Sequence, residues 1–365
     1  MTPARRPARP SSIDVDWSAA ARLAGRLASP GPTDGRAELE RLVNALHVDA
    51  DRALPIALTA SRLGDVMPVS PPARVLVVDR PGWARAAARS FAGMTGDGPD
   101  AAVTAPSRGH AGAGRAPHGQ TLQTGALLAV LSGRVLGQFD PFGTDEPGGH
   151  LLLVAPNVLR TQRALGVDPE DFRLWVCVHE QTHALQFAAA PWLTGYLRDQ
   201  VAQLMASVAG TTTTQDMGAL LGAVVRALRP GGPPPQEGDW PLLDAVLEEP
   251  DLRRVEAITA VMSLLEGHAD VTMDSVGRSV IPSRRRLRSR LDARRTSAGR
   301  VDRVLRQVLG IDAKLAQYRR GASFVRTVRR AGGRGALDAV WSGPQALPTA
   351  REIADPRAWV RRVHG

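Results

Sequence analysis

Cysteine, lysine and long apolar runs are all scarce in this 365-residue chain. The single cysteine, Cys177, excludes a disulfide within the chain and fits a reducing compartment. No apolar run reaches the roughly 18 residues that a membrane-spanning helix needs. No apolar segment follows the basic residues at the N-terminus either, so neither a membrane span nor a signal peptide is predicted. Together these observations predict a cytoplasmic protein.

Lysine is represented by Lys314 alone, so arginine supplies nearly all of the positive charge behind the formal net charge of +10. Ala, Gly and Pro are abundant as well, which indicates a compositional bias rather than selection for an acidic partner. Residues 283–306 are the most arginine-rich stretch, but they contain no aromatic residue for base stacking. Apolar side chains recur there at helical spacing, which favours a solvated basic helix face over a polyanion-binding surface. We expect no nucleic-acid partner.

Helical periodicity dominates what is present. It extends over residues 16–28, 34–63, 83–92, 122–136, 168–191 and 250–277. Two short aliphatic runs, 74–79 and 150–155, have the composition of strands, and residues 138–142 suggest a turn. The sequence therefore predicts a mainly helical α+β fold.

Four regions follow from composition. Residues 1–12 are predicted to be a disordered tail, and residues 13–92 an N-terminal region of helices and a strand. Residues 93–120 are rich in Gly, Ala and Pro and are predicted to form a mobile loop. Residues 121–365 carry the candidate site, and residues 13–365 are expected to form one compact unit. The oligomeric state is not predicted.

The strongest motif is His179-Glu180-Gln181-Thr182-His183, which matches the pattern H-E-x-x-H. Asp168 is a suitable N-cap, Pro169 suits the first turn and Pro191 ends the run, so the motif is predicted to lie on a helix. Residues four apart share a helix face, so His179 and His183 can bind one metal ion, with Glu180 beside it as a general base. The alternative is a pair of hydrogen-bonded core histidines with Glu180 in a salt bridge.

A catalytic zinc usually takes three protein ligands, and this motif supplies two of them. Glu266 is the favoured third ligand because a charge in the apolar stretch ITAVMSLLEGHADVTM needs a partner. His268 and Asp270 are the alternatives. Asp270 is also placed to orient a ligand histidine, and Gly267 allows another helix to approach closely.

Two further features bear on catalysis. Tyr318 is a candidate for stabilising an oxyanion, although a core tyrosine is an equally good interpretation. The strand at 150–155 precedes the motif and is a candidate cleft wall that pairs with an extended substrate. An interior strand without substrate contact fits that stretch at least as well.

Several segments of the chain resemble an uncharacterised zincin-like metalloprotease family of bacterial proteins. They are HEQTHALQF with APWL, SLLEGHADVTMD, GIDAKLAQYRRGASFV and ALPTAREIADPRAWVRRV. Those proteins often carry a deazaflavin-coenzyme-biosynthesis label. VLGQFDPF and LLVAPN resemble upstream blocks, so the resemblance covers most of residues 14–363. The glycine-rich segment at 93–119 and the proline-rich loop near 233 depart from it as insertions. The resemblance implies a zincin-like core with an H-E-x-x-H helix and a second helix that carries a glutamate.

The resemblance also implies His179, His183 and Glu266 as zinc ligands, with Glu180 as the base. The predicted function is therefore a zinc-dependent hydrolase acting on a peptide or amide substrate. The alternative is a scaffold without turnover that binds zinc or, through its arginines, a polyanion.

Overall fold

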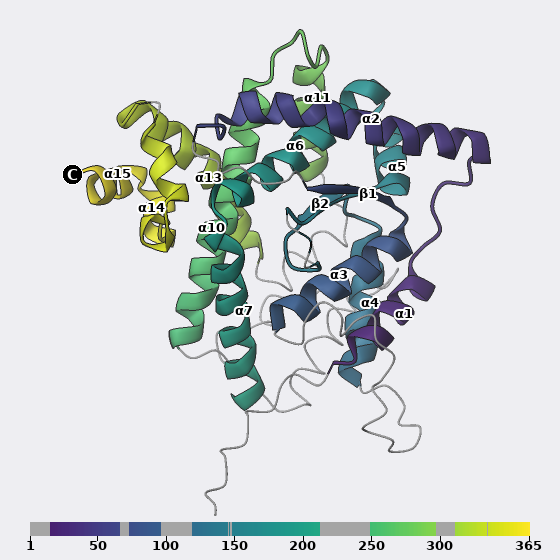
Figure 1. Ribbon diagram of the computed structural model, residues 1–365, viewed down its shortest axis with the longest axis horizontal. Helices are drawn as coiled ribbons and strands as arrows, with labels where there is room; N and C mark the ends of the chain where they lie inside the picture. The colour runs from purple at the N-terminus through teal and green to yellow at the C-terminus, as the bar shows by residue number, and fades with distance from the viewer. Residues whose placement is uncertain are drawn as a thin grey trace, which may run out of the picture.

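The computed structural model describes residues 15–65, 73–95, 119–144, 146, 148–211, 249–296, 311–333 and 335–365. Figure 1 labels the α-helices and the strands β1 and β2. Along the chain the elements are α1 (Trp17–Leu27), α2 (Arg36–Ser61), β1 (Arg74–Val78), α3 (Arg80–Thr95), α4 (Gly119–Ser132), β2 (Gly137–Asp140), β3 (His150–Val154), α5 (Ala155–Leu165), α6 (Pro169–Ala189), α7 (Trp192–Thr211), α10 (Glu249–Ser275), α11 (Arg284–Thr296), α13 (Ile311–Ala331), the 3-10 helices η2 (Ala336–Trp341) and η3 (Pro344–Ala346), α14 (Ala350–Ala354) and α15 (Pro356–His364). The predicted mainly helical α+β fold is confirmed.

The sheet has three strands in the order β1-β3-β2. β1 runs parallel to β3, with Arg74 opposite His150 and Val78 opposite Val154. β2 runs antiparallel to β3 and forms an edge of the sheet.

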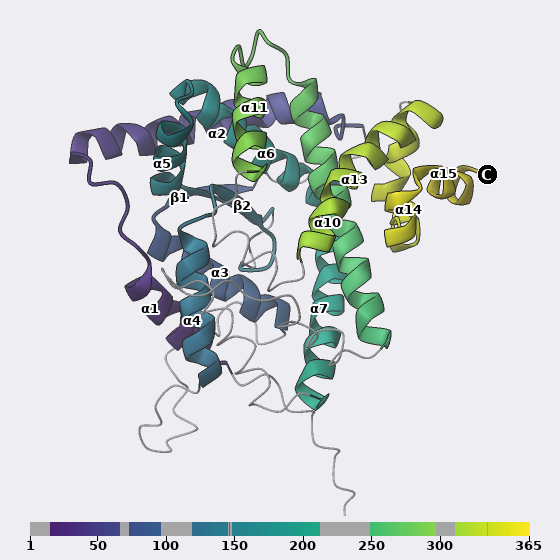
Figure 2. The same ribbon diagram turned by 180° about the vertical axis from the view of Figure 1, so that it is seen from behind.

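Helices cover both faces of this sheet. Leu151 and Leu153 belong to a core that also includes side chains of α2 and α6, whereas Leu152 and Val154 belong to a second core with α1, α3 and α4. Successive side chains of a strand point to opposite faces, so the uninterrupted run from Leu151 to Val154 is buried on both sides. Figures 1 and 2 show the two groups of helices on either side of the strands.

Two sequence interpretations of this region need correction. Residues 138–142 are not simply a turn, because Gly137–Asp140 form β2 and the turn comes after Asp140. The strand predicted at 150–155 exists as β3 and pairs on both sides, so the alternative of an interior strand is confirmed and the cleft-wall interpretation is wrong. Among the described strands, β2 pairs only with β3, so the edge near the motif helix belongs to β2.

The motif lies on α6, as predicted. Asp168 caps the helix by accepting a hydrogen bond from the backbone N–H of Asp171 at 2.9 Å, and Pro169 occupies the first turn. Glu170 and Asp171 place negative charge at the positive end of the helix dipole. The helix ends at Ala189, one residue before the cap and two before Pro191.

The second helix of interest, α10, packs closely against α13 at two glycines. A Cβ atom added to Gly267 would lie 2.1 Å from the carbonyl carbon of Gly321, and one added to Gly321 would lie 1.9 Å from the carbonyl oxygen of Ser263. No other residue type fits there without separating the helices. The expectation that Gly267 admits a neighbouring helix is confirmed.

The C-terminal segment after α13 folds over this pair of helices. Trp359 is fully buried and donates a hydrogen bond from Nε1 to the Ala346 carbonyl at 2.8 Å. Trp341 packs edge-on against the His268 ring, with ring centroids 5.4 Å apart. The segment thus closes over α10 on the side away from the sheet, as Figure 1 shows.

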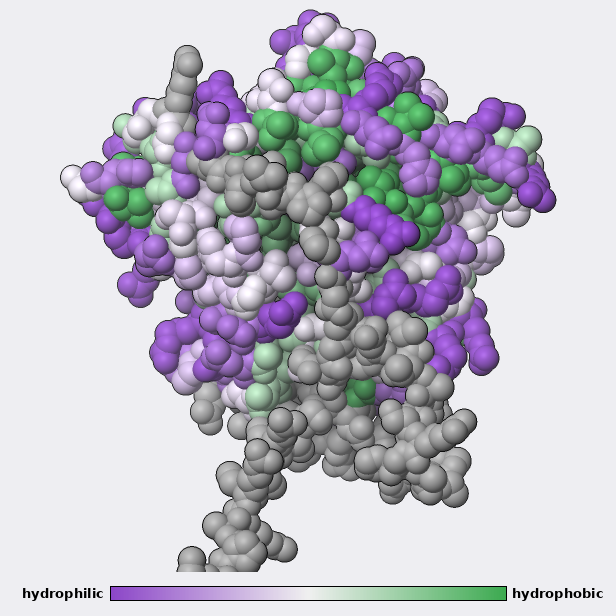
Figure 3. Space-filling view, in the orientation of Figure 1, coloured by the Kyte–Doolittle hydropathy of each residue, from purple (hydrophilic) through white to green (hydrophobic). Residues whose placement is uncertain are grey.

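Some expectations fall outside the described residues. They are the predicted tail at 1–12, residues 96–118 of the predicted loop and the proline-rich loop near 233. The division of the chain into regions therefore stays a prediction. Among the described helices, none is both long enough and apolar enough to span a bilayer. Figure 3 shows hydrophilic residues over much of the described surface on one face, with smaller hydrophobic areas between them.

Candidate metal centre

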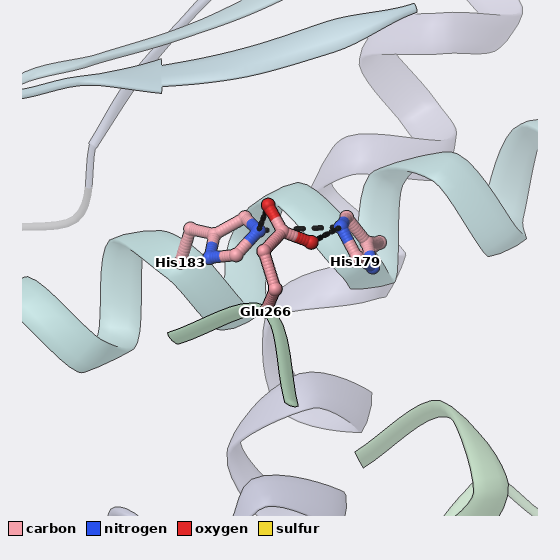
Figure 4. A group of neighbouring side chains, drawn as sticks. All are labelled: His179, His183 and Glu266. Carbon is pink, nitrogen blue, oxygen red and sulfur yellow. Dashed lines mark hydrogen bonds and ion pairs between the residues drawn. The ribbon is translucent and has the colours of Figure 1, made fainter. Parts of the chain in front are cut away.

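Three side chains from two helices converge beside the sheet. The Nε2 atoms of His179 and His183, one turn apart on α6, lie 3.2 Å from each other. Glu266, from α10, places Oε2 3.7 Å from His179 Nε2 and Oε1 3.6 Å from His183 Nε2. Figure 4 shows the carboxylate of Glu266 between the two imidazoles. Within the part of the chain that the structure describes, these three residues form the one group of His, Cys, Asp and Glu side chains close enough to hold a metal ion.

The spacing of these atoms fits zinc. Tetrahedral zinc with ligand bonds of 2.0–2.2 Å separates its ligand atoms by about 3.4 Å. The Nε2–Nε2 separation of 3.2 Å and the distances of 3.6 and 3.7 Å from the two histidines to the two oxygens of Glu266 lie near that value, and one ligand atom from each residue can be chosen so that all three lie within 4.8 Å of one another. Two imidazole nitrogens and a carboxylate oxygen are also the donor types found at catalytic zinc sites that keep a position open. The residues therefore fit a zinc ion without rearrangement of the helices.

The site is open on one side. The side chains of His179 and His183 are 19% and 14% exposed, and that of Glu266 is 38% exposed. A metal ion held there would have a face directed to solvent, where water or a substrate can reach it.

Glu180 is buried beside the three candidate ligands, with 8% of its surface exposed. Burial raises the pKa of its carboxyl group to about 7, and the nearby charge of Glu266 acts in the same direction. His183 and a hydrogen bond from the backbone N–H of Phe139 act in the opposite direction. Glu180 thus places beside the candidate ligands a carboxyl group that binds a proton more tightly than an ordinary glutamate does.

The edge strand β2 explains why Glu180 is held so tightly. Val154 N–H donates to the Leu136 carbonyl at 2.9 Å, and ladder bonds of an antiparallel pair recur at every second residue. The backbone groups of Gly137 and Phe139 therefore point away from β3, and the Phe139 N–H reaches Glu180. A Cβ atom on Gly137 would lie 2.6 Å from Glu180 Cγ, so only glycine lets the strand come this close.

Gln186 completes the surroundings of His183 and is fully buried. Its Oε1 lies 2.9 Å from His183 Nδ1, while its Nε2 donates to the Leu265 carbonyl at 2.9 Å and lies 3.0 Å from His268 Nδ1. Sequence reasoning did not identify Gln186 as part of the site. Its position on the same helix face as His179 and His183 was the available signal.

The alternatives to Glu266 lie elsewhere. His268 is 1% exposed and faces Gln186 and Arg329, so it is not among the three convergent side chains. Burial, followed by the charge of Arg329, lowers the pKa of His268 to about 3. Asp270 places its two oxygens 3.3 Å from Nη1 and Nη2 of Arg288.

The prediction that Asp270 orients one ligand histidine is not tested at His183. Gln186, not Asp270, occupies the position at His183 Nδ1. A role for Asp270 toward His179 stays a prediction. The side chain of Tyr318 is outside the described side chains, so its proposed contact with a reacting oxyanion also stays a prediction.

Comparison with known proteins agrees with this geometry. The sequence profile of a family described as zincin-like metallopeptidase matches residues 15–360. The chain belongs to this family. The match covers nearly all of the described residues and includes both α6 and α10, which carry the candidate metal ligands.

One solved structure is similar over almost the whole chain. It comes from Chloroflexus aurantiacus and is described as "a putative hydrolase with a novel fold". The two chains are 28% identical, with a TM-score of 0.63, and the alignment covers 95% of this chain and 98% of the other. No curated protein matches this chain. The zincin-like resemblance noted in the sequence is thus confirmed at the level of the metallopeptidase family.

Proposed function

We propose that this chain is a zinc-dependent hydrolase of peptide or amide bonds. The observation that carries the proposal is the convergence of His179, His183 and Glu266 at spacings that suit zinc, with Glu180 buried alongside. Membership of a zincin-like metallopeptidase family supports a peptide substrate.

The geometry suggests separate roles for the zinc ion and for Glu180. A zinc ion bound by the three side chains would supply a Lewis acid that lowers the pKa of a water molecule. Glu180 accepts the proton from the attacking water and later delivers it to the leaving amine. The N–H of Phe139 and the burial by β2 hold the Glu180 carboxyl group in one orientation, so this proton transfer needs little reorganisation.

The edge of β2 is the surface on which we place an extended substrate. The N–H and carbonyl groups of Gly137 and the carbonyl of Phe139 point outward next to Glu180, whereas the Phe139 N–H is already bonded to the Glu180 carboxyl group. A peptide that adds to this edge would be held by main-chain hydrogen bonds with its scissile bond near the base.

Gly137→Ala tests the fit between this strand and the base. The added methyl group must displace the Glu180 side chain or the strand, since its nearest neighbour would be at 2.6 Å. We expect kcat to fall about tenfold or more, which corresponds to about 1.4 kcal/mol or more in the barrier, with zinc content unchanged. Gly133→Ala is the matched control, because a Cβ there meets its nearest neighbour at an ordinary 3.6 Å. Equal activities of the two variants would show that the close approach of β2 has no role in catalysis.

The function itself is tested by incubating the zinc-loaded protein with a mixed peptide library and detecting new termini by mass spectrometry. We expect cleavage that a chelator abolishes and added zinc restores. Full zinc occupancy without cleavage of any peptide would favour the scaffold without turnover instead.

A nucleic-acid partner remains outside the proposal. Several arginines of α11 already have partners within the chain. Arg284 donates to the Asp274 carbonyl at 2.6 Å, and Arg286 donates to the Gly166 carbonyl at 3.1 Å. Arg288 forms ion pairs with three aspartates. These contacts engage part of the basic face within the chain, and both the solvated basic helix face and the absence of a nucleic-acid partner stay predictions. The cytoplasmic location stays a prediction.

A further inference from the structure

We propose that Gln186 is a positioning residue that fixes the proton of His183 on Nδ1 and ties the two metal-binding helices together. The inference rests on the proposed metal centre but does not depend on hydrolysis. It follows from the hydrogen-bonding capacity of the groups around one buried amide.

The orientation of the Gln186 amide is determined by its neighbours. The carbonyl oxygen of Leu265 can only accept a hydrogen bond, so the group 2.9 Å from it must be the NH2 of Gln186. The oxygen of the amide then faces His183 Nδ1 at 2.9 Å. Because an amide oxygen can only accept, Nδ1 of His183 must carry a proton.

A neutral imidazole with its proton on Nδ1 has its lone pair on Nε2. That nitrogen is the one 3.6 Å from Glu266 Oε1 and 3.2 Å from His179 Nε2, at the centre of the candidate metal site. Gln186 therefore selects the His183 tautomer that can bind a metal ion. Without this acceptor, the ring would be free to place its proton on Nε2.

The second amide hydrogen of Gln186 extends the network to His268. Nδ1 of His268 lies 3.0 Å from Gln186 Nε2 and accepts this hydrogen, so the proton of the neutral His268 ring is on Nε2. Nη2 of Arg329 lies 3.3 Å from His268 Nε2, but with the proton on Nε2 both nitrogens are donors, and both donate to the Ser61 carbonyl, Arg329 at 3.3 Å. The rival ligand His268 thus serves as an acceptor that holds Gln186 in place.

This network couples the two helices at the ligand residues themselves. Gln186 is on α6, three residues after His183, whereas its partner Leu265 immediately precedes Glu266 on α10. One buried side chain therefore sets both the tautomer of His183 and the distance at which Glu266 approaches it. Loss of partners outside the ligands typically weakens metal binding about 10- to 100-fold.

The test compares Gln186→Met, which has a similar length but lacks both amide groups, with Gln181→Met as the matched control. Gln181 is also a buried glutamine of α6, and its Nε2 donates to the Ala50 carbonyl at 3.2 Å rather than to the metal centre. We expect zinc affinity, measured by chelator competition, to fall about 10- to 100-fold in Gln186→Met and less than about threefold in Gln181→Met. Equal affinities of the two variants would overturn the proposal.

The tautomer provides a readout that requires neither metal nor activity. Long-range 1H–15N correlation spectra of metal-free, 15N-histidine-labelled protein at mildly alkaline pH distinguish the two neutral ring forms. The His183 signals are assigned by their loss in His183→Asn. We expect the Nδ1–H form in the natural protein and a shift toward Nε2–H in Gln186→Met. An Nε2–H ring in the natural protein would contradict the proposal, even if the protein binds zinc and cleaves peptides.

Gln186→Glu keeps the test decisive if Gln186→Met does not fold. Its carboxylate retains an acceptor for His183 but loses the donors to Leu265 and His268. We expect the Nδ1–H form to persist and zinc affinity to remain above that of Gln186→Met. A change to Nε2–H in Gln186→Glu would show that the acceptor does not set the tautomer.

Discussion

Glu180→Gln is expected to retain zinc and to lose hydrolysis, with kcat lowered by a factor of about 10² to 10⁴. The substitution preserves size, and the amide oxygen of glutamine can still accept the hydrogen bond from the Phe139 N–H. It removes the capacity to take a proton from water. The three candidate ligands are unchanged, so the metal should stay bound.

The measurement is kcat on the best peptide from the library, together with zinc per chain by elemental analysis. Glu170→Gln is the control, because Glu170 lies on the same helix but its side chain is 62% exposed and pairs with Arg52. That variant should keep essentially full activity. The loss of a general base should leave about a hundredth of the natural activity or less. Retention of more than about a tenth by Glu180→Gln would refute the role of Glu180 as the base.

Gly267→Ala is expected to destabilise the fold strongly and to disturb the metal centre with it. The new methyl group would lie 2.1 Å from the Gly321 carbonyl carbon and 2.5 Å from the Ala322 nitrogen, so α10 and α13 must separate. Overpacking of this kind costs about 1–3 kcal/mol, and more when the obstacle is backbone. Because Gly267 follows Glu266 directly, a shift of α10 also moves the third ligand.

The change is measured by the denaturant midpoint of the metal-free protein and by zinc affinity. Gly195→Ala on α7 is the matched control, since a Cβ there has no neighbour within 4 Å. An alanine in an open helix position should stabilise the protein by up to about 1 kcal/mol. The two Gly→Ala changes thus have opposite expected signs. A Gly267→Ala protein as stable as the natural one would mean that the helices are not in contact at this point.

The three candidate metal ligands were predictable from the sequence because each depends on local information. His179 and His183 are one helical turn apart, and the helix that holds them has strong end signals at Asp168, Pro169 and Pro191. Glu266 stands out as a charge in a mostly apolar stretch of its helix, where a charge needs a partner. That it meets the histidines at 3.6 and 3.7 Å depends on the packing of two helices, which the sequence could suggest but not place.

The features that the sequence missed depend on tertiary contacts. β2 contains Gly137 and Asp140, which have low β propensity, and a Pro-Phe-Gly turn follows it, so the local pattern indicates a turn. Pairing with β3, which is buried from Leu151 to Val154, overrides that preference. Gln186 is a polar residue on a mixed helix face, and nothing local reveals that Leu265 and His268 of a distant segment provide its partners.

The most direct test of the metal centre is the zinc content of the natural protein and of Glu266→Ala, purified in parallel and dialysed against the same weak chelator. Far-UV circular dichroism confirms that both are folded. The geometry predicts about one zinc per chain in the natural protein and far less in Glu266→Ala, because two imidazoles alone make an incomplete site. A natural protein without zinc, or a folded Glu266→Ala that keeps one zinc per chain, would contradict the three-ligand centre.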